Sequence, residues 1–136
     1  MAKKPVKNEK LIELERKLKF YEINDEIFKS GLTVITGKAE VYHDYILERY
    51  DHDFKVTGTE QGRYHHLTKE KDNLNHFIIW LPTLKVKDML TLIHEVGHFV
   101  FDLLANERGV PHTNDTDEVY EYYREYILKL IFAKAP

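Results

Sequence analysis

The strongest constraint on the fold is a long apolar segment with helical periodicity that follows Pro82. Apolar residues recur every three or four positions from Met89 to Leu104, which predicts an α-helix. They extend almost all round this helix, at Met89, Leu90, Leu92, Ile93, Val96, Phe99, Val100, Leu103 and Leu104. We therefore expect the helix to be buried in the centre of the domain. Gly109 and Pro111 predict where it ends.

The other periodic segments predict an α+β domain around this helix. Leu11, Leu14, Leu18 and Tyr21 have the spacing of a short amphipathic helix that begins at Glu9. Further along the chain we expect a strand over 32–36, a helix over 38–50, a β-hairpin over 54–76 with a strand over 64–68, a buried strand over 76–82 and a last helix from 115 onward. The predicted order is helix, strand, helix, hairpin, helix, helix.

Composition limits the classes of function. The chain has 136 residues, which predicts a single domain over residues 9–136 after a flexible basic tail over residues 1–8. Its 20 Lys and Arg residues are outnumbered by 23 Asp and Glu residues, and no apolar run reaches the roughly 20 residues that span a bilayer. We therefore expect no nucleic-acid surface and no membrane anchor. Because the N-terminus lacks the apolar segment of a secretory signal, we expect a cytoplasmic protein.

Three ionisable residues, His94, Glu95 and His98, interrupt the apolar helix in the run HEVGH. On an α-helix the two histidines lie about 40° apart and about 6 Å along the axis, so both imidazoles can bind one metal ion. Glu95 lies about 60° beyond His98, where it can act on a water without binding the ion. Because the chain has no cysteine, a metal must be held by His, Asp or Glu. The motif predicts a Zn²⁺ centre with Glu95 as the general base.

Three segments, HFIIWLP, MLTLIHEVGHFVFDLLANERG and TDEVYEYYREYILKLI, together resemble the small zincin-type metallopeptidase domains of the ImmA/IrrE kind. The resemblance is greatest to the short versions encoded by bacteriophages and prophages, and it covers residues 30–132. It implies a zincin-like α+β fold with a small twisted mixed sheet, an active-site helix under the edge strand, and a following C-terminal helix that donates a Glu as third metal ligand. It also implies a bacterial host cell, but no particular substrate.

A catalytic zinc site needs a third protein ligand besides the two histidines. The metzincin arrangement requires Gly three residues and His or Asp six residues after the second His, where this chain has Phe101 and Leu104. This excludes the metzincin arrangement and favours a Glu from the next helix, either Glu118 or Glu121.

The choice between these two glutamates depends on the start of the last helix. Domains similar to this one tend to carry an acidic pair, a small residue, an aromatic residue, any residue and then Tyr, and residues 117–122 fit that order with Glu118 as the ligand. The opposing interpretation makes Asp115 and Glu118 a capping box, which leaves Glu121 as the ligand. The remaining candidates are Asp102, Asp117 and His112.

Several residues near the motif lead to further expectations. Asp102 either orients a liganding imidazole or reaches solvent. Gly97 costs a helix interior roughly 1 kcal/mol relative to Ala, which predicts the close approach of a neighbouring element. The tyrosines at 120, 122, 123 and 126 predict either a core stripe or a phenol for an oxyanion. The histidines at 43, 52, 65, 66, 76 and 112 lack partner spacing, so we expect them at the surface or in the hairpin.

The predicted function is that of an intracellular zinc metallopeptidase, a hydrolase in which Glu95 takes a proton from a metal-activated water that attacks a peptide bond. We expect the peptide or protein substrate to lie extended beside the strand that ends at Trp80 and Leu81. The alternative is a non-catalytic metal-binding module with a structural or regulatory role in a phage or prophage. The sequence leaves the substrate and the oligomeric state open.

Overall fold

The computed structural model of the chain describes residues 9–57, 59–68 and 74–135. The predicted basic tail and most of the turn between the hairpin strands lie outside these residues. The elements follow the order α1 (Glu9–Arg16), β1 (Lys19–Asp25), β2 (Ser30–Thr36), α2 (Ala39–Tyr50), β3 (Arg63–Thr68), β4 (Asn75–Leu81), α3 (Met89–Phe101) and α4 (Asp117–Lys134).

A four-stranded sheet with the order β1-β2-β4-β3 forms the middle of the domain. β1 pairs with β2 and β3 pairs with β4 in antiparallel fashion, whereas the central strands β2 and β4 are parallel and end together at Thr36 and Leu81. The predicted hairpin and the predicted mixed sheet of an α+β fold are thus confirmed. β2 and β4 are rich in aliphatic and β-branched residues because both of their faces are covered.

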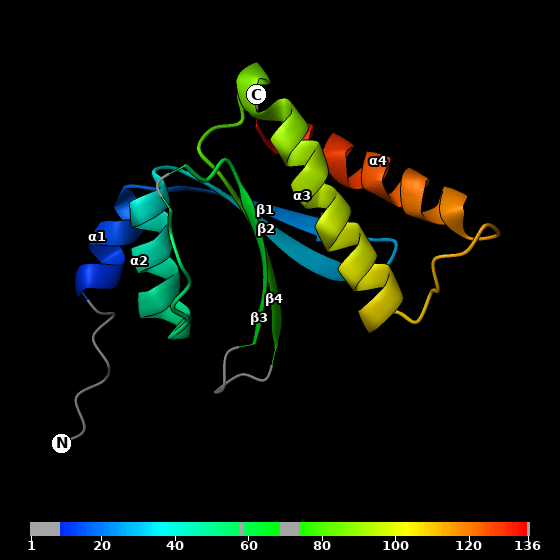
Figure 1. Cartoon of the computed structure of the whole chain (residues 1–136), viewed down its shortest axis with the longest axis horizontal. Helices are drawn as coiled ribbons and strands as arrows, with labels where there is room; N and C mark the ends of the chain where they lie inside the picture. Colours follow the sequence, from blue (N-terminus) through cyan, green and yellow to red (C-terminus); the bar gives the residue numbers. More distant parts are fainter. Residues whose placement is uncertain (1–8, 58, 69–73, 136) are drawn as a thin grey trace.

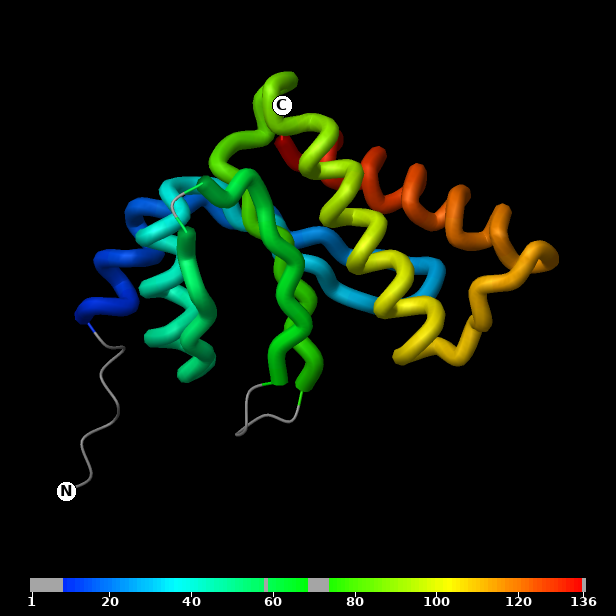
Figure 2. The backbone as a smooth tube through the Cα atoms, in the orientation of Figure 1, coloured from blue at the N-terminus to red at the C-terminus, as the bar shows by residue number. Residues whose placement is uncertain are grey.

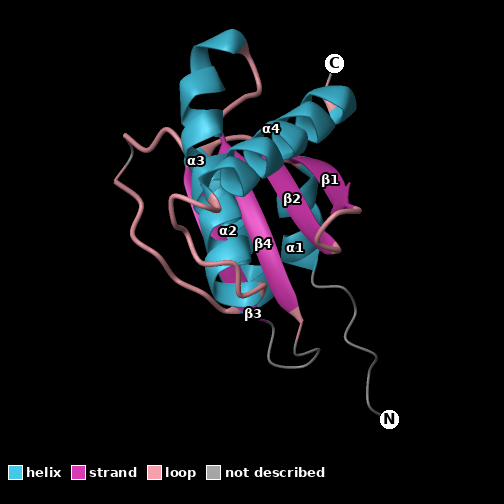
Figure 3. Cartoon of the chain, turned by 90° about the vertical axis from the view of Figure 1, so that its right-hand side faces the viewer, coloured by secondary structure: helices cyan, strands magenta, loops and turns pink. Residues whose placement is uncertain are grey.

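Helices cover both faces of the sheet (Figures 1 and 3). α1 and α2 pack on one face, against a core that includes Ile35, Ile78 and Trp80. α3 and α4 pack on the other face, against a core that includes Val34 and Ile79. Neighbouring residues along β2 and β4 therefore serve opposite faces, as the alternation of a strand requires. The result is three layers, with the sheet between two pairs of helices.

β1 is the element that the sequence analysis did not predict. Tyr21 has helical spacing from Leu14 and Leu18, but α1 ends at Arg16 and Tyr21 lies in β1. This strand pairs with β2 over its whole length, from Lys19 opposite Thr36 to Asp25 opposite Ser30. The prediction of a helix as far as Tyr21 is wrong, because tertiary pairing with β2 outweighs the local helical periodicity.

α3 is less buried than its apolar composition predicts. Leu92, Val96 and Phe99 are fully buried against the sheet, but Leu90 and Phe101 are 83% and 49% exposed. The helix therefore lies in an outer layer, and the prediction that it occupies the centre of the domain is wrong. This placement leaves one side of α3 accessible for chemistry.

The end of α3 is well defined. The helix continues into a π-helical turn over Asp102–Glu107, and Gly109 then adopts a φ of 67°, in the left-handed region that favours glycine. The Val110 N–H donates a hydrogen bond to the Leu104 carbonyl at 2.8 Å, which satisfies one of the last carbonyls of the helix. The predicted helix end at Gly109 is confirmed. None of the helices among the described residues has the length and apolar character needed to cross a membrane.

Candidate metal centre

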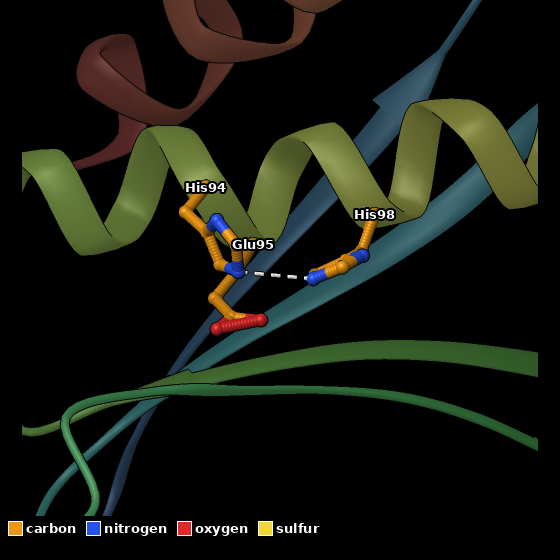
Figure 4. A group of neighbouring side chains, drawn as sticks. All are labelled: His94, Glu95 and His98. Carbon is orange, nitrogen blue, oxygen red and sulfur yellow. Dashed lines mark hydrogen bonds between the residues drawn. The ribbon is translucent and has the colours of Figure 1, made fainter.

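Three ionisable side chains of α3 lie together and point towards the strands (Figure 4). His94 and His98 are one turn apart, and their Nε2 atoms lie 3.0 Å from each other. With Glu95 they form a group in which one ligand atom from each residue lies within 4.8 Å of the others. The sequence analysis predicted this proximity, because residues four apart on a helix share one side.

The two histidines have the geometry of zinc ligands. Two nitrogen atoms that bind a tetrahedral zinc ion at about 2.1 Å lie about 3.4 Å apart, close to the 3.0 Å between the two Nε2 atoms. Both histidines are exposed, so an ion can reach them from solvent. The donor set thus fits a divalent metal ion.

Glu95 differs from the histidines in its burial. Its exposed fraction is 7%, although it precedes an exposed histidine by only three residues. Burial raises the pKa of the Glu95 carboxyl above its ordinary value, while the nearby charges of His98, His94 and Arg63 act in the opposite direction. A carboxylate with a raised pKa is a stronger base, so its surroundings suit proton transfer.

A cavity of about 390 Å³ lies in front of this group. Its lining consists of Glu60, Gly62, Arg63, Tyr64, His94, Glu95 and His98. Glu60 and Arg63 form an ion pair at 2.7 Å, which fixes the wall opposite α3. No sequence pattern indicated this wall. The strand predicted over 64–68 could have indicated Tyr64 only if its place at the edge of the sheet had been known.

The edge strand beside the cavity is β3. β4 pairs with β2 on one side and with β3 on the other, so it offers no free edge for an added strand. The prediction that the strand ending at Trp80 and Leu81 receives the substrate is therefore wrong. Of the two edge strands, β1 and β3, it is β3 whose residues line the cavity.

Gly62 holds the start of β3 close to α3. A Cβ atom at this position would lie 2.5 Å from Thr91 Cγ2 and 3.3 Å from Glu95 Cγ. Only glycine leaves room for this approach, which brings the backbone of the cavity wall against the candidate base. Gly97 has no such role, because nothing lies within 4 Å of the place where its Cβ would be. The prediction of a close approach at Gly97 is wrong.

Asp102 connects α3 to β3. Its Oδ2 atom accepts a hydrogen bond from the Tyr64 hydroxyl at 2.7 Å and lies 2.9 Å from His66 Nδ1, and its Oδ1 atom accepts one from Asn106 at 2.8 Å. Burial alone would raise the pKa of Asp102, but these hydrogen bonds and the charge of His66 together hold it below its ordinary value. Asp102 thus contacts Tyr64 and His66 in place of a liganding imidazole, and its side chain keeps a relative exposure of 20%.

The predicted third ligand lies outside the cluster of His94, Glu95 and His98. Glu118 is exposed in the first turn of α4, about 200° round the helix from the buried Tyr120. Glu121 lines a cavity of about 150 Å³ together with Gly97, and its carboxylate pairs with Arg124 at 2.5 Å.

The capping interpretation of Glu118 is wrong. α4 begins at Asp117 with Thr116 as its N-cap residue, and no side chain caps it, so Asp115 and Glu118 do not have the positions of a capping box. Asp117 pairs with His112 at 2.9 Å. Glu118 as the third ligand stays a prediction.

Several of the remaining histidines and tyrosines form hydrogen bonds away from the metal centre. His65 lies in the hairpin strand β3, one of the two expected places, and is buried there with its Nδ1 atom 2.6 Å from the Tyr42 hydroxyl. The Tyr123 hydroxyl donates to Asp25 at 2.6 Å, and the Tyr120 hydroxyl donates to the Val110 carbonyl at 2.5 Å. These two tyrosines belong to the core, whereas Tyr122 is 66% exposed.

Comparison of the chain with family models, with curated proteins and with solved structures finds no match. The functional assignment therefore depends on the geometry of the site.

Proposed function

We propose that the protein is a zinc-dependent peptidase. The observation that carries this proposal is the pair of Nε2 atoms 3.0 Å apart on α3, with the buried Glu95 carboxylate beside them and a cavity in front. Two imidazoles one turn apart, with an adjacent carboxylate that is free to act as the base, are the part of a metal-assisted hydrolytic site that one helix supplies, and a third protein ligand completes it.

In this proposal His94 and His98 hold the ion and Glu118 completes its protein ligands. Zinc at such a site acts as a Lewis acid on the scissile carbonyl and lowers the pKa of a water molecule toward about 7. Glu95 accepts the proton from the attacking water and passes it to the leaving amide nitrogen. Its burial and raised pKa support both steps, because a base must hold the proton long enough to return it.

The proposed substrate is an extended segment of a peptide or protein. β3 is an edge strand and its first residues line the cavity, so a peptide that adds to this edge would run directly past Glu95. We place this activity in a bacterial cell or a phage-infected one, in keeping with the resemblance of the motif segments.

The test is peptide hydrolysis by the wild-type protein and by Glu95→Gln, each loaded with zinc. Glutamine keeps the size of the side chain but cannot take the proton, so cleavage of a peptide library should fall by at least about 100-fold. Unchanged cleavage by Glu95→Gln would remove Glu95 as the base. Absence of cleavage by a zinc-loaded wild-type protein would contradict the peptidase proposal.

One observation favours a second candidate, a non-catalytic metal-binding module. Among the described residues, the cluster contains ligands from α3 alone, and Glu118 stands apart from it. A module of this kind would bind zinc without hydrolysing peptides. It would also gain thermal stability from zinc equally in the wild type and in Glu95→Gln.

A further inference from the structure

A second cavity lies away from the metal centre, at the carboxyl ends of the two parallel strands. It has a volume of about 350 Å³ and is lined by Lys17, Lys19, Tyr21, Thr36, Gly37, Pro82, Thr83, Leu84, Lys85 and Ala135. No lining residue is shared with the cavity at His94 and His98. Ala135, just beyond the end of α4, lines the cavity together with Leu84 and Lys85 from the turn that leads into α3, and Figure 2 traces the path of the backbone through both segments.

The position of this cavity follows from the path of the chain. β2 and β4 end side by side at Thr36 and Leu81. From there one connection leads to α2 on one face of the sheet, and the other leads to α3 on the opposite face. Two connections that separate in this way leave a crevice at the carboxyl ends of the strands, which is where open sheets with parallel strands bind small ligands.

Gly37 brings a third segment to the crevice. Its φ is +148°, and a Cβ atom there would lie 2.6 Å from Leu18 Cδ2 and 3.3 Å from the Lys17 carbonyl oxygen. The turn between α1 and β1 is therefore held against the end of β2. This contact holds the turn that carries Lys17 and Lys19 at the cavity, which Lys85 also lines.

Among the described residues, basic side chains outnumber acidic ones at this rim. Lys17, Lys19 and Lys85 contribute three ammonium groups, and no Asp or Glu lines the cavity. Within residues 9–57, 59–68 and 74–135, no ion pair joins any of these lysines to a carboxylate. Among those residues, the Asp88 carboxylate accepts a hydrogen bond from the hydroxyl of the lining residue Thr83. Three cations around one crevice repel each other, and an anion between them would relieve that repulsion.

We propose that this cavity binds a small molecule that carries a phosphate group. A phosphate has close to two negative charges at neutral pH and several acceptor oxygens, so it can pair with more than one ammonium group at once. The volume lies at the lower end of the range for small-molecule sites and exceeds what a single phosphate fills. The ligand is therefore a phosphorylated small molecule whose remainder lies against Tyr21 and Leu84. This inference is independent of the proposed peptidase function.

The test is a calorimetric titration with pyrophosphate. Because pyrophosphate also chelates metal ions, the titration uses the His94→Ala/His98→Ala protein without zinc as its background. We expect binding with a dissociation constant below about 1 mM and a loss of at least tenfold in affinity for the added double change Lys17→Gln/Lys85→Gln. The matched control is Lys55→Gln, an exposed lysine that does not line the cavity, and it should bind as the background does.

Citrate, which carries carboxylates in place of phosphates, distinguishes the two kinds of anion. We expect citrate to bind at least tenfold more weakly than pyrophosphate. Equal affinity for pyrophosphate with and without Lys17 and Lys85, in proteins that keep the far-ultraviolet circular dichroism of the background, would overturn the site. Equal affinity for citrate and pyrophosphate would overturn the assignment to phosphate. Since the background lacks both histidines, neither result depends on whether the protein is a peptidase.

Discussion

Glu118 and Glu121 differ in what their side chains contact, and this difference makes the third ligand testable. Glu118 is exposed on the outer side of α4, whereas Glu121 pairs with Arg124 next to Gly97. If Glu118 binds the ion, the first turn of α4 has to reorient when zinc binds. That segment follows a loop over 108–116, in which such a change is easiest.

We expect Glu118→Ala to weaken zinc binding by more than 100-fold and Glu121→Ala to weaken it less. Removing a metal ligand lowers the zinc affinity more than removing a group that only lies near the ligands. Competition with a chromogenic chelator measures both affinities. If Glu121→Ala has the larger effect, Glu121 is the ligand. If neither change has an effect, the ion has no protein ligand on α4.

The residues of the cluster could be predicted from the sequence and those of the opposite wall could not. The spacing of His94 and His98 is local, since any helix brings residues four apart together. Tyr64 and Arg63 reach the cavity only because β3 pairs with β4 at the edge of the sheet. A local sequence pattern does not indicate which strand of a sheet lies at its edge.

At the scale of elements, the contact between β3 and α3 rests on Gly62. Gly62→Ala would place a methyl group 2.5 Å from Thr91 Cγ2, 3.2 Å from Leu81 Cδ2 and 3.3 Å from Glu95 Cγ, so the packing around it has to shift. We expect this change to lower the free energy of unfolding by about 1–3 kcal/mol.

The matched control is Gly97→Ala, in the interior of α3 where nothing lies within 4 Å of the new methyl group. Alanine should raise the free energy of unfolding by about 1 kcal/mol there, because it favours the helix. Urea denaturation measures both proteins. A Gly62→Ala protein as stable as the wild type would contradict the close packing of Gly62 against α3.

β1 and α3 show which features of the helices and strands could not be predicted from local sequence patterns. The segment KFYEIND of β1 continues the helical spacing of α1, so only its pairing with β2 reveals a strand. For α3 the helix itself is correctly predicted, but Leu90 and Phe101 face solvent. Apolar residues all round a helix indicate burial only when every side has a neighbour, and the sheet covers one side.

At the scale of the whole molecule, we expect the buried His65 to make the free energy of unfolding depend on pH. Burial lowers the pKa of His65 from its ordinary 6.5 to about 4, and the charges of His52 and Arg63 act in the same direction. The unfolded chain then binds a proton at a higher pH than the folded chain does. Stability is therefore constant with respect to this group above pH 6.5 and falls as the pH drops from there towards 4.

We expect a loss of about 2 kcal/mol in the free energy of unfolding between pH 7.5 and pH 5 from His65 alone. In His65→Asn an amide oxygen can still accept a hydrogen bond from the Tyr42 hydroxyl, but the side chain at position 65 does not titrate. The variant should therefore lose less stability over this range. Urea denaturation at a series of pH values gives the difference. Identical pH dependence in the two proteins would contradict the assignment.

The measurement that tests the metal centre most directly is the zinc content of the purified proteins, determined by mass spectrometry after dialysis. We expect about one zinc per chain in the wild type and in Glu95→Gln, and less than about 0.2 in His94→Ala and in His98→Ala, because one imidazole cannot hold the ion. Full zinc content in both histidine variants would contradict the site on α3, and loss of zinc from Glu95→Gln would make Glu95 a ligand instead of a base.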